Sequence, residues 1–392
     1  MGSKFKYLVI VLFLFNFAAK AQTDIDFQYV DSLTYGYFKS GDWNNLIKLG
    51  TEAIDHDIDY KYLRQRIGLA FFSKGDYINA RKHFEKALSF YSFDTFTLVY
   101  LYYTYLNTIQ AEYSGYFASK MPQDVRKGLS IKSFQPVESI DCEYNFKFAG
   151  TTLRSNPQYF HIGINSQLGL RLGLYQMFSN YNQTVTVQKP LKDEIVKDQQ
   201  YEYFALLKFT ISSHWMLKSA YHFLNSTYST TNSYANLGFL GLSANISRFN
   251  FEIDASVLKN EEYFVKQSGV QAGVSFSRNL NMYLTSALSL TNQQNINQII
   301  YNQKAGFKLF KKVWLEGNAT FGDITNYNDY DAMYVYNSID PTTFRTGATL
   351  FFNAGKHITI WANYCYERKE FNENSFYHYN QYSYLGGVKW KL

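Results

Sequence analysis

The segment Ser139–Ala149, with the sequence SIDCEYNFKFA, decides the fold of most of this chain. From Cys142 to Phe148 its apolar side chains stand at every second position, and polar or charged side chains stand between them. Successive side chains of a β-strand point to opposite faces, so this alternation predicts a strand with one apolar and one polar face. A strand of a membrane barrel needs both faces, one toward lipid and one toward the lumen.

The same period of two recurs to the end of the chain. The alternating runs are 139–149, 157–166, 170–182, 200–211, 215–227, 232–244, 248–259, 263–277, 281–292, 295–309, 312–323, 341–353, 357–370 and 375–391. They predict an antiparallel transmembrane β-barrel of about 14 strands over residues 139–392, with 12 or 16 as the counts that one misplaced hairpin would give. We expect the longer connections, 183–199 and 324–340, outside the barrel on the side opposite the termini. A soluble β-sandwich is the alternative, but aromatic residues would not then follow one face of every strand.

Composition agrees with a membrane barrel. Aromatic residues make up 19% of the chain, with 36 Tyr and 34 Phe. Barrels place such residues in girdles at both bilayer interfaces. After residue 21 no run of 18 or more apolar residues predicts a membrane-spanning helix. The formal net charge of +6 is too small to indicate nucleic-acid binding.

Residues 1–21 have the features of a secretory signal peptide. Lys4 and Lys6 precede an apolar run of about a dozen residues, and Ala19 and Ala21 are small residues suited to cleavage. No cysteine follows directly, so a lipoprotein anchor is not expected. The alternative is a retained membrane anchor.

Residues 24–120 carry an internal repeat. Gly41-Asp42-Trp43 and Gly75-Asp76-Tyr77 lie 34 residues apart, which resembles the tetratricopeptide (TPR) repeat, a pair of antiparallel helices. The resemblance implies periplasmic helical hairpins, and its motif positions here are Gly68, Gly75, Ala80, Phe84 and Ala87. The sequence departs from the motif at Arg64, where Trp is usual, and at Ser92, where Pro is usual.

A third, degenerate helical unit starts near Asp94, which we expect to cap a helix. This helix is either a terminal core helix or a helix docked on the barrel rim. Residues 121–138 are expected to form a linker.

Two further groups of residues are assigned roles. Aromatic and Arg side chains are enriched at binding hot spots, so the first helices predict a concave docking face for a periplasmic protein. Its expected residues are Tyr29, Leu33, Tyr37, Arg64 and Phe71, with a place in the core between the repeats as the alternative for Phe71. The last strand, with Gly387, Trp390 and Leu392, resembles the C-terminal signal that the barrel-assembly machinery recognises.

The polar face of the strands predicts the lining of the lumen. Its expected charges include Glu143, Lys147, Lys208, Glu252, Asp254, Lys304, Glu316, Arg345 and Glu367. Because both signs are nearly balanced, a strongly ion-selective pore is not indicated. The charges are either paired within a partly filled lumen or simply solvated.

No pattern in the sequence predicts catalytic or metal-binding residues, and no cofactor is expected. The seven His residues form no metal-ligand spacing, and His161 and His222 are expected to be polar residues of the barrel wall.

As a whole the chain resembles Gram-negative outer-membrane proteins that join a periplasmic TPR module to a barrel, some of which export exopolysaccharide. The resemblance implies a non-enzymatic component of polysaccharide or protein export or assembly. Its partners would be outer-membrane lipid, the barrel-assembly machinery and a periplasmic protein, without nucleic acid. One alternative is a surface anchor whose barrel does not conduct. The other is an outer-membrane barrel enzyme.

Overall fold

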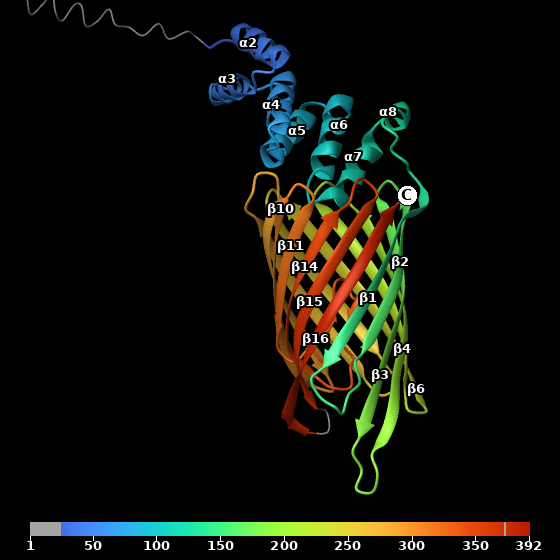
Figure 1. Cartoon of the computed structure of the whole chain (residues 1–392). Coiled ribbons are helices and arrows are strands. Elements are labelled where there is room, and N and C mark those ends of the chain that lie inside the picture. Colours follow the sequence, from blue (N-terminus) through green and yellow to red (C-terminus); the bar gives the residue numbers. More distant parts are fainter. Residues whose placement is uncertain (1–24, 372–373) are drawn as a thin grey trace, which may run out of the picture.

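The computed structural model describes residues 25–371 and 374–392, so the expected signal peptide at 1–21 lies outside the described residues. The described chain has two parts. Helices α2–α8 stand over one mouth of a β-barrel, and the C-terminus lies at that same mouth (Figure 1). We call this mouth the helical end and the opposite mouth the far end.

The barrel is closed and has 14 antiparallel strands, which confirms the predicted fold class. Each strand pairs with its neighbours along the chain, β11 pairs with β14, and β1 closes the barrel against β16. Closure leaves no strand edge with unpaired N–H and C=O groups, as a lipid environment requires. The strands are β1 (Gln135–Ala149), β2 (Gln158–Gly169), β3 (Leu172–Val187), β4 (Glu194–Thr210), β5 (Trp215–Tyr228), β6 (Thr231–Ile246), β7 (Phe249–Lys259), β8 (Phe264–Ser275), β9 (Met282–Gln293), β10 (Ile296–Phe310), β11 (Val313–Phe321), β14 (Thr342–Asn353), β15 (Ile358–Phe371) and β16 (Asn374–Lys391).

Two regions show the largest differences from the sequence-based strand boundaries. The segment 183–199 is not a long connection, because β3 and β4 extend as a hairpin joined only by residues 188–193. Its β-branched residues favour pairing, and Val185 lies opposite Val196. The first strand begins at Gln135, four residues before the expected start, and an irregularity in its register separates Gln135 from Ser139.

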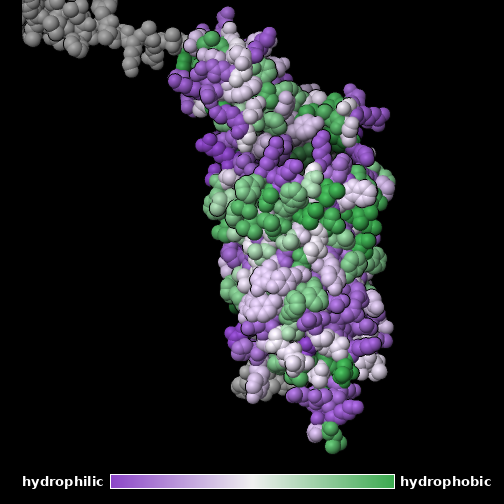
Figure 2. Space-filling model, in the orientation of Figure 1, coloured by the Kyte–Doolittle hydropathy of each residue, from purple (hydrophilic) through white to green (hydrophobic). Residues whose placement is uncertain are grey.

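The outer surface of the barrel is apolar in a band next to the helices (Figure 2). Toward the far end the same face becomes more polar. Large apolar side chains point outward from the strands, among them Phe251, Leu288 and Trp390, each more than 40% exposed. Exposed apolar side chains on alternate positions match a lipid-facing wall, so this is a barrel of the outer-membrane type.

The helices are α2 (Phe27–Ser40), α3 (Trp43–Asp55), α4 (Lys61–Ser73), α5 (Tyr77–Phe90), α6 (Thr95–Leu106), the short 3-10 helix η1 (Ala111–Tyr113), α7 (Ser114–Lys120) and α8 (Gln123–Gly128). Helix α8 lies within the segment expected to be a linker. No helix in the described ranges is long and apolar enough to cross a membrane.

The two repeat turns have the same geometry. Gly41 and Gly75 each adopt a φ of +72°, the left-handed conformation that glycine tolerates at a helix end. Asp42 and Asp76 then cap the following helices by accepting hydrogen bonds from the backbone N–H groups three residues later. The 34-residue period therefore corresponds to a repeated local structure.

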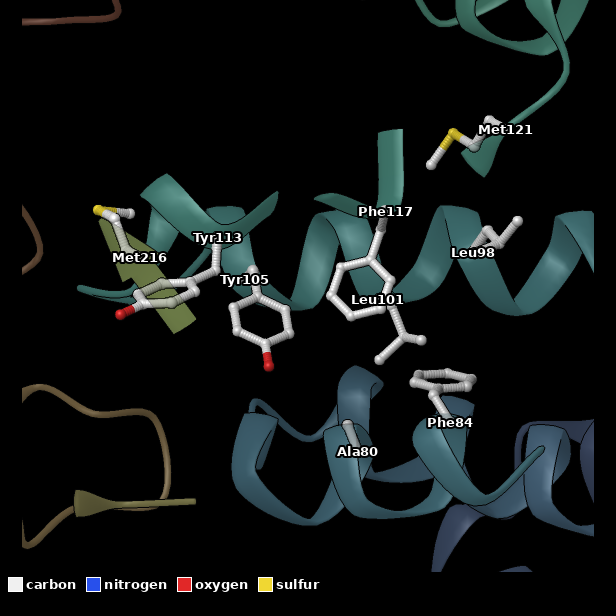
Figure 3. Packing of buried hydrophobic residues seen from close by; sticks show 9 residues of the cluster. All are labelled: Ala80, Phe84, Leu98, Leu101, Tyr105, Tyr113, Phe117, Met121 and Met216. Atoms are coloured by element: carbon white, nitrogen blue, oxygen red, sulfur yellow. The ribbon is translucent and has the colours of Figure 1, made fainter. Parts of the chain in front are cut away.

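Asp94 caps α6 as predicted, and this helix has both of the roles that the sequence left open. Figure 3 shows Leu98 and Leu101 of α6 over Phe84 of α5. The same cluster continues through Tyr113 to Met216 of the barrel strand β5 (Figure 3). One apolar core therefore joins the helices to the barrel rim.

Candidate functional site: a plugged lumen under a helical cap

Residues 322–341, which we call the plug loop, connect β11 to β14 and fold into the lumen. The loop contains a small hairpin of β12 (Asn328–Asp329) and β13 (Tyr334–Val335). The prediction that 324–340 lies outside the barrel was wrong. The loop carries apolar and aromatic side chains that are buried in the interior, including Ile324, Tyr327 and Ala332 at no more than 3% exposure.

Polar contacts attach the hairpin tip to the wall. Nζ of Lys218 lies 2.8 Å from a carboxylate oxygen of Asp331 and 2.8 Å from one of Glu252 on the wall. Nδ1 of His222, a fully buried side chain, lies 2.8 Å from the carbonyl oxygen of Ala332. Its Nε2 lies 3.2 Å from Glu202. These buried contacts fix the position of the tip.

An apolar seat on one side of the lumen supports the same tip. Ala332 packs in a buried cluster with Phe204, Leu237, Leu258 and Val265, which belong to β4, β6, β7 and β8. Burying this surface favours the inserted loop by about 25 cal/mol for each Å² removed from water. Withdrawal of the loop would expose the seat to the lumen.

Three tyrosines of the loop contact other parts of the wall. Nζ of Lys304 lies 4.0 Å from the ring centre of Tyr330. The hydroxyl of Tyr334 donates to Glu143 at 3.4 Å, and the ring of Tyr336 lies 5.5 Å from the guanidinium of Arg345. The loop thus reaches β10, β1 and β14 as well as the seat, and it spans the lumen.

The tip is held in a costly backbone conformation. Tyr330, Asp331 and Ala332 have φ values of 53°, 59° and 67°, a left-handed region that non-glycine residues rarely adopt. Each such residue costs on the order of 1–3 kcal/mol, so the surrounding contacts must hold the turn.

The nine predicted lumen charges lie on the inner face or at its mouth. Several of these charges form ion pairs. Lys147 and Arg345 both contact Glu367, with nitrogen–oxygen distances of 3.6 and 3.4 Å. Lys304 lies 4.0 Å from Glu316. Glu252 contacts Lys218, Glu143 accepts from the indole N–H of Trp361 at 2.9 Å, and Asp254 borders the cavity at the helical end. Lys208 lies 2.7 Å from Glu112 of the helical cap, the name we give to helices α2–α8 over the mouth. The sequence did not predict Asp331 and the tyrosines of the plug loop as parts of this network. It placed His222 in the barrel wall but did not predict its contact with the loop.

The plug loop separates two spaces in the lumen. A cavity of about 940 Å³ lies toward the helical end, and one of about 590 Å³, which we call the far chamber, lies toward the far end. Tyr330 and Met333 border both. The plug loop is therefore the partition between them.

The helical cap is bonded to the barrel rim. Nη2 of Arg81 donates to the carbonyl oxygen of Ser247, in a barrel turn, and its Nη1 donates to Gln110 at 2.6 Å. Gln110 in turn donates to Asn245 at 2.6 Å, and the hydroxyl of Tyr105 donates to the carbonyl oxygen of Ser213 at 3.2 Å. Together with the apolar core of Figure 3, these bonds hold the helices over the mouth.

The predicted docking residues do not share one exposed face. Tyr29 is 41% exposed, and Leu33 and Tyr37 are half-buried. Arg64 is buried, where it pairs with Asp59 at 2.6 Å and lies 3.3 Å from Nδ1 of His83. Phe71 stacks on the same imidazole with ring centres 5.5 Å apart.

Arg64 therefore stabilises the repeat from inside, and its environment changes two pKa values. Burial, and then the positive charge of Arg64, lowers the pKa of His83 to about 4. A hydrogen bond from Arg64 lowers the pKa of Asp59. Sequence period alone gave no sign of this partner, because Asp59 lies in the loop before α4.

The other predicted motif residues occupy defined positions. Ala80, Phe84 and Ala87 are fully buried, and a Cβ added to Gly68 would lie 2.8 Å from the Phe84 ring. Gly75 forms the turn described above. On β16, a Cβ at Gly387 would collide with the Trp361 ring, whereas Trp390 and Leu392 point outward at 55% and 53% exposure.

The described residues contain no group of three or more His, Cys, Asp or Glu side chains that could hold a metal ion. His161 lies 3.3 Å from Asp141 and 3.8 Å from Glu143. His161 and His222 both contact carboxylates, and the contacts of His222 support the plug loop.

No protein-family model and no curated protein sequence matches the chain. Solved structures to which it is similar include a bacterial polysaccharide outer membrane secretin, at 6% identity and a TM-score of 0.41, covering 66% of this chain and 99% of the other. The toluene transporter TodX of P. putida has 5% identity and a TM-score of 0.46, covering 66% and 91%. The NanC porin has 8% identity and a TM-score of 0.35, covering 64% and 100%. At such identities the likeness concerns the fold alone.

Proposed function

We propose that the protein is a non-enzymatic transport or secretion component of the outer membrane, with its lumen closed by the plug loop. The observation that carries this proposal is the combination of a lumen spanned by one loop and a helical cap bonded over one mouth. We also call this cap the helical module. A loop with a strained tip and charged anchors can change position when those anchors are broken. The module would receive the partner that supplies or controls the cargo.

The helical module would lie in the periplasm. Bacterial barrels have short turns on the periplasmic side and longer loops outside. Here the turns at the helical end are short, such as residues 247–248 between β6 and β7, whereas the far end carries the extended β3–β4 hairpin and the plug loop. A periplasmic protein could then bind the TPR-like helices.

The exposed aromatic residues of the module are the best candidates for that contact. Tyr29 is joined by Tyr35 and Tyr62, which are 49% and 58% exposed. Tyr29→Ala and Tyr62→Ala should weaken co-purification of a periplasmic protein from crosslinked membranes. Arg64→Ala serves as the contrast, since it should lower the stability of the module by removing a buried ion pair.

Conductance in planar bilayers tests the transport part. The intact protein should be closed or open only briefly, whereas replacement of residues 323–340 by a short Gly-Ser turn should give steady openings. Both forms must show heat-modifiable migration on SDS gels, which demonstrates a folded barrel. A folded, loop-deleted barrel that never conducts would exclude a transport role.

A surface anchor with a permanently filled lumen is the second candidate. The apolar seat of Ala332 favours it, because a loop that leaves the seat exposes buried apolar surface. Crosslinking distinguishes the two. A bifunctional thiol crosslinker between cysteines introduced at Asp331 and Lys218 should abolish transport but leave an anchor function unchanged.

A further inference from the structure

The far chamber contains a buried guanidinium group, that of Arg345, two of whose nitrogens lack a hydrogen-bond acceptor among the described residues. Nε and Nη1 of Arg345 are both buried, and neither finds an acceptor among the described residues. The nearest carboxylate, Glu367, lies 3.4 Å from Nε. Buried polar groups in native proteins are nearly always hydrogen-bonded, and leaving a charged donor without a partner is costly. An unfilled pair of donors on a cavity wall therefore indicates a bound acceptor.

The charge around Arg345 favours an anion. Glu367 is the carboxylate between Lys147, at 3.6 Å, and Arg345. Gln381 also donates to it, at 2.6 Å. Lys369 lies two residues along β15 and so on the same face, and it donates to Ser338 and Thr342 at 3.1 and 2.9 Å. Three cationic side chains thus lie around one carboxylate, and all four border the far chamber. The other carboxylates of the lining are Glu143, Asp198, Glu202 and Glu316, so the excess of positive charge is local to Arg345.

Two further buried polar atoms belong to the same chamber. The side-chain oxygen of Asn145 and the hydroxyl of Tyr159 have no hydrogen-bond partner among the described residues. They lie opposite each other on β1 and β2, and Asn145 is two residues from Lys147 on the same face. The Tyr159 hydroxyl could donate to an oxygen of the ligand, and Asn145 could accept from a hydroxyl on it.

We propose that the far chamber is a binding site for a small solute bearing an oxyanion, either a carboxylate or a phosphate group. The guanidinium of Arg345 would contact the oxyanion in its fork geometry, and Lys147 would add a second positive charge. The chamber of about 590 Å³ is large enough for a small organic molecule. The site goes beyond the proposed transport function and does not depend on it.

Titration calorimetry of the full-length protein in detergent tests the site with sodium phosphate and sodium citrate as probes. We expect saturable binding of at least one probe, with one site per chain. Arg345→Gln should weaken it at least tenfold, and Lys147→Gln should weaken it several-fold. Arg345→Lys keeps the positive charge but loses the paired N–H donors of the guanidinium group. Its affinity should therefore lie between those of the wild type and Arg345→Gln.

Lys308→Gln is the matched control. Lys308 is another cation of the wall. Its Nζ lies 6.0 Å from the ring centre of Trp314, and it does not border the far chamber. This variant should bind like the wild type. All variants must remain heat-modifiable.

Two results would overturn the proposal: no saturable binding of either probe by folded wild-type protein, or unchanged affinity in Arg345→Gln. Neither result bears on conductance. Conversely, a chain that binds phosphate and never conducts would keep the site and reject the transport function.

Discussion

Lys218 of the barrel wall and Asp331 of the plug loop form a half-buried ion pair of 2.8 Å across 113 residues of sequence. The same ammonium group also contacts Glu252 at 2.8 Å. One cation therefore holds two carboxylates together, one fixed in the wall and one on the strained tip of the loop. This ion pair is therefore one of the contacts that hold the loop, beside the hydrogen bond of His222 to Ala332 and the apolar seat.

Lys218→Met should loosen the plug loop. It removes the cation and leaves Asp331 and Glu252 as two buried carboxylates in close proximity, which repel each other when both are ionised. We expect frequent openings in planar-bilayer recordings, where the wild type is mostly closed. The double variant Lys218→Met with Asp331→Asn removes the repulsion and should open less often than the single variant. Identical traces from wild type and Lys218→Met would show that the other contacts of the loop, including the apolar seat, hold it without this ion pair.

The helical module should lose stability as pH falls from about 6.5 to about 4. His83 has a pKa near 4 in the folded module, against 6.5 as its ordinary value. Its folded-state pKa is depressed, so the unfolded chain takes up the proton first. The module therefore keeps its full free energy of unfolding above pH 6.5. It loses up to about 3 kcal/mol of this free energy as the pH approaches 4.

Thermal unfolding followed by circular dichroism at several pH values measures this effect. His83→Gln removes the titrating group and should flatten the dependence across that window. Asp59 contributes only at lower pH, because its pKa is depressed below 3.8. A steep decline between pH 6.5 and 4 that persists in His83→Gln would assign the effect to other groups.

Phe84→Ala should unfold the module locally. Phe84 is fully buried between Gly68 and α6, and truncation of a buried Phe typically costs about 3–5 kcal/mol. Ala87→Trp should have a comparable effect through overpacking, since Ala87 is also fully buried. Limited proteolysis should cleave these variants between residues 25 and 120 while the barrel stays heat-modifiable. An exposed substitution, Glu52→Ala, should leave the cleavage pattern unchanged.

The strand count could be predicted from the sequence because a wall between lipid and lumen imposes a period of two on each strand. Segments such as Ser139–Ala149 carry that period in their own residues. The helical turns were predictable for a similar local reason, since Gly and Asp fit a left-handed helix end and the following cap. Both features therefore depend on residues that are close together in the sequence.

The inward path of the plug loop could not be predicted in this way. Its residues show no period, and the partners of Asp331, Tyr334 and Tyr336 lie on β5, β1 and β14, far away in the sequence. The assignment of Arg64 to a docking face failed for a different reason. An arginine on a helix is equally suited to a partner protein or to a carboxylate of its own chain, and the repeat pattern does not show that the loop before α4 places Asp59 beside it.

The last strand should control insertion of the barrel. Trp390 lies opposite Ile140 of β1 and Ile358 of β15, so it stands at the seam where the barrel closes, and its side chain points outward. A charged residue on the lipid face costs up to several kcal/mol, depending on its depth. Trp390→Asp combined with Leu392→Asp should therefore reduce the amount of protein in outer-membrane fractions several-fold and remove heat-modifiable migration. Trp390→Phe with Leu392→Phe keeps an aromatic, apolar surface and should insert normally. Wild-type levels of the double Asp variant in the outer membrane would show that these two positions do not govern assembly.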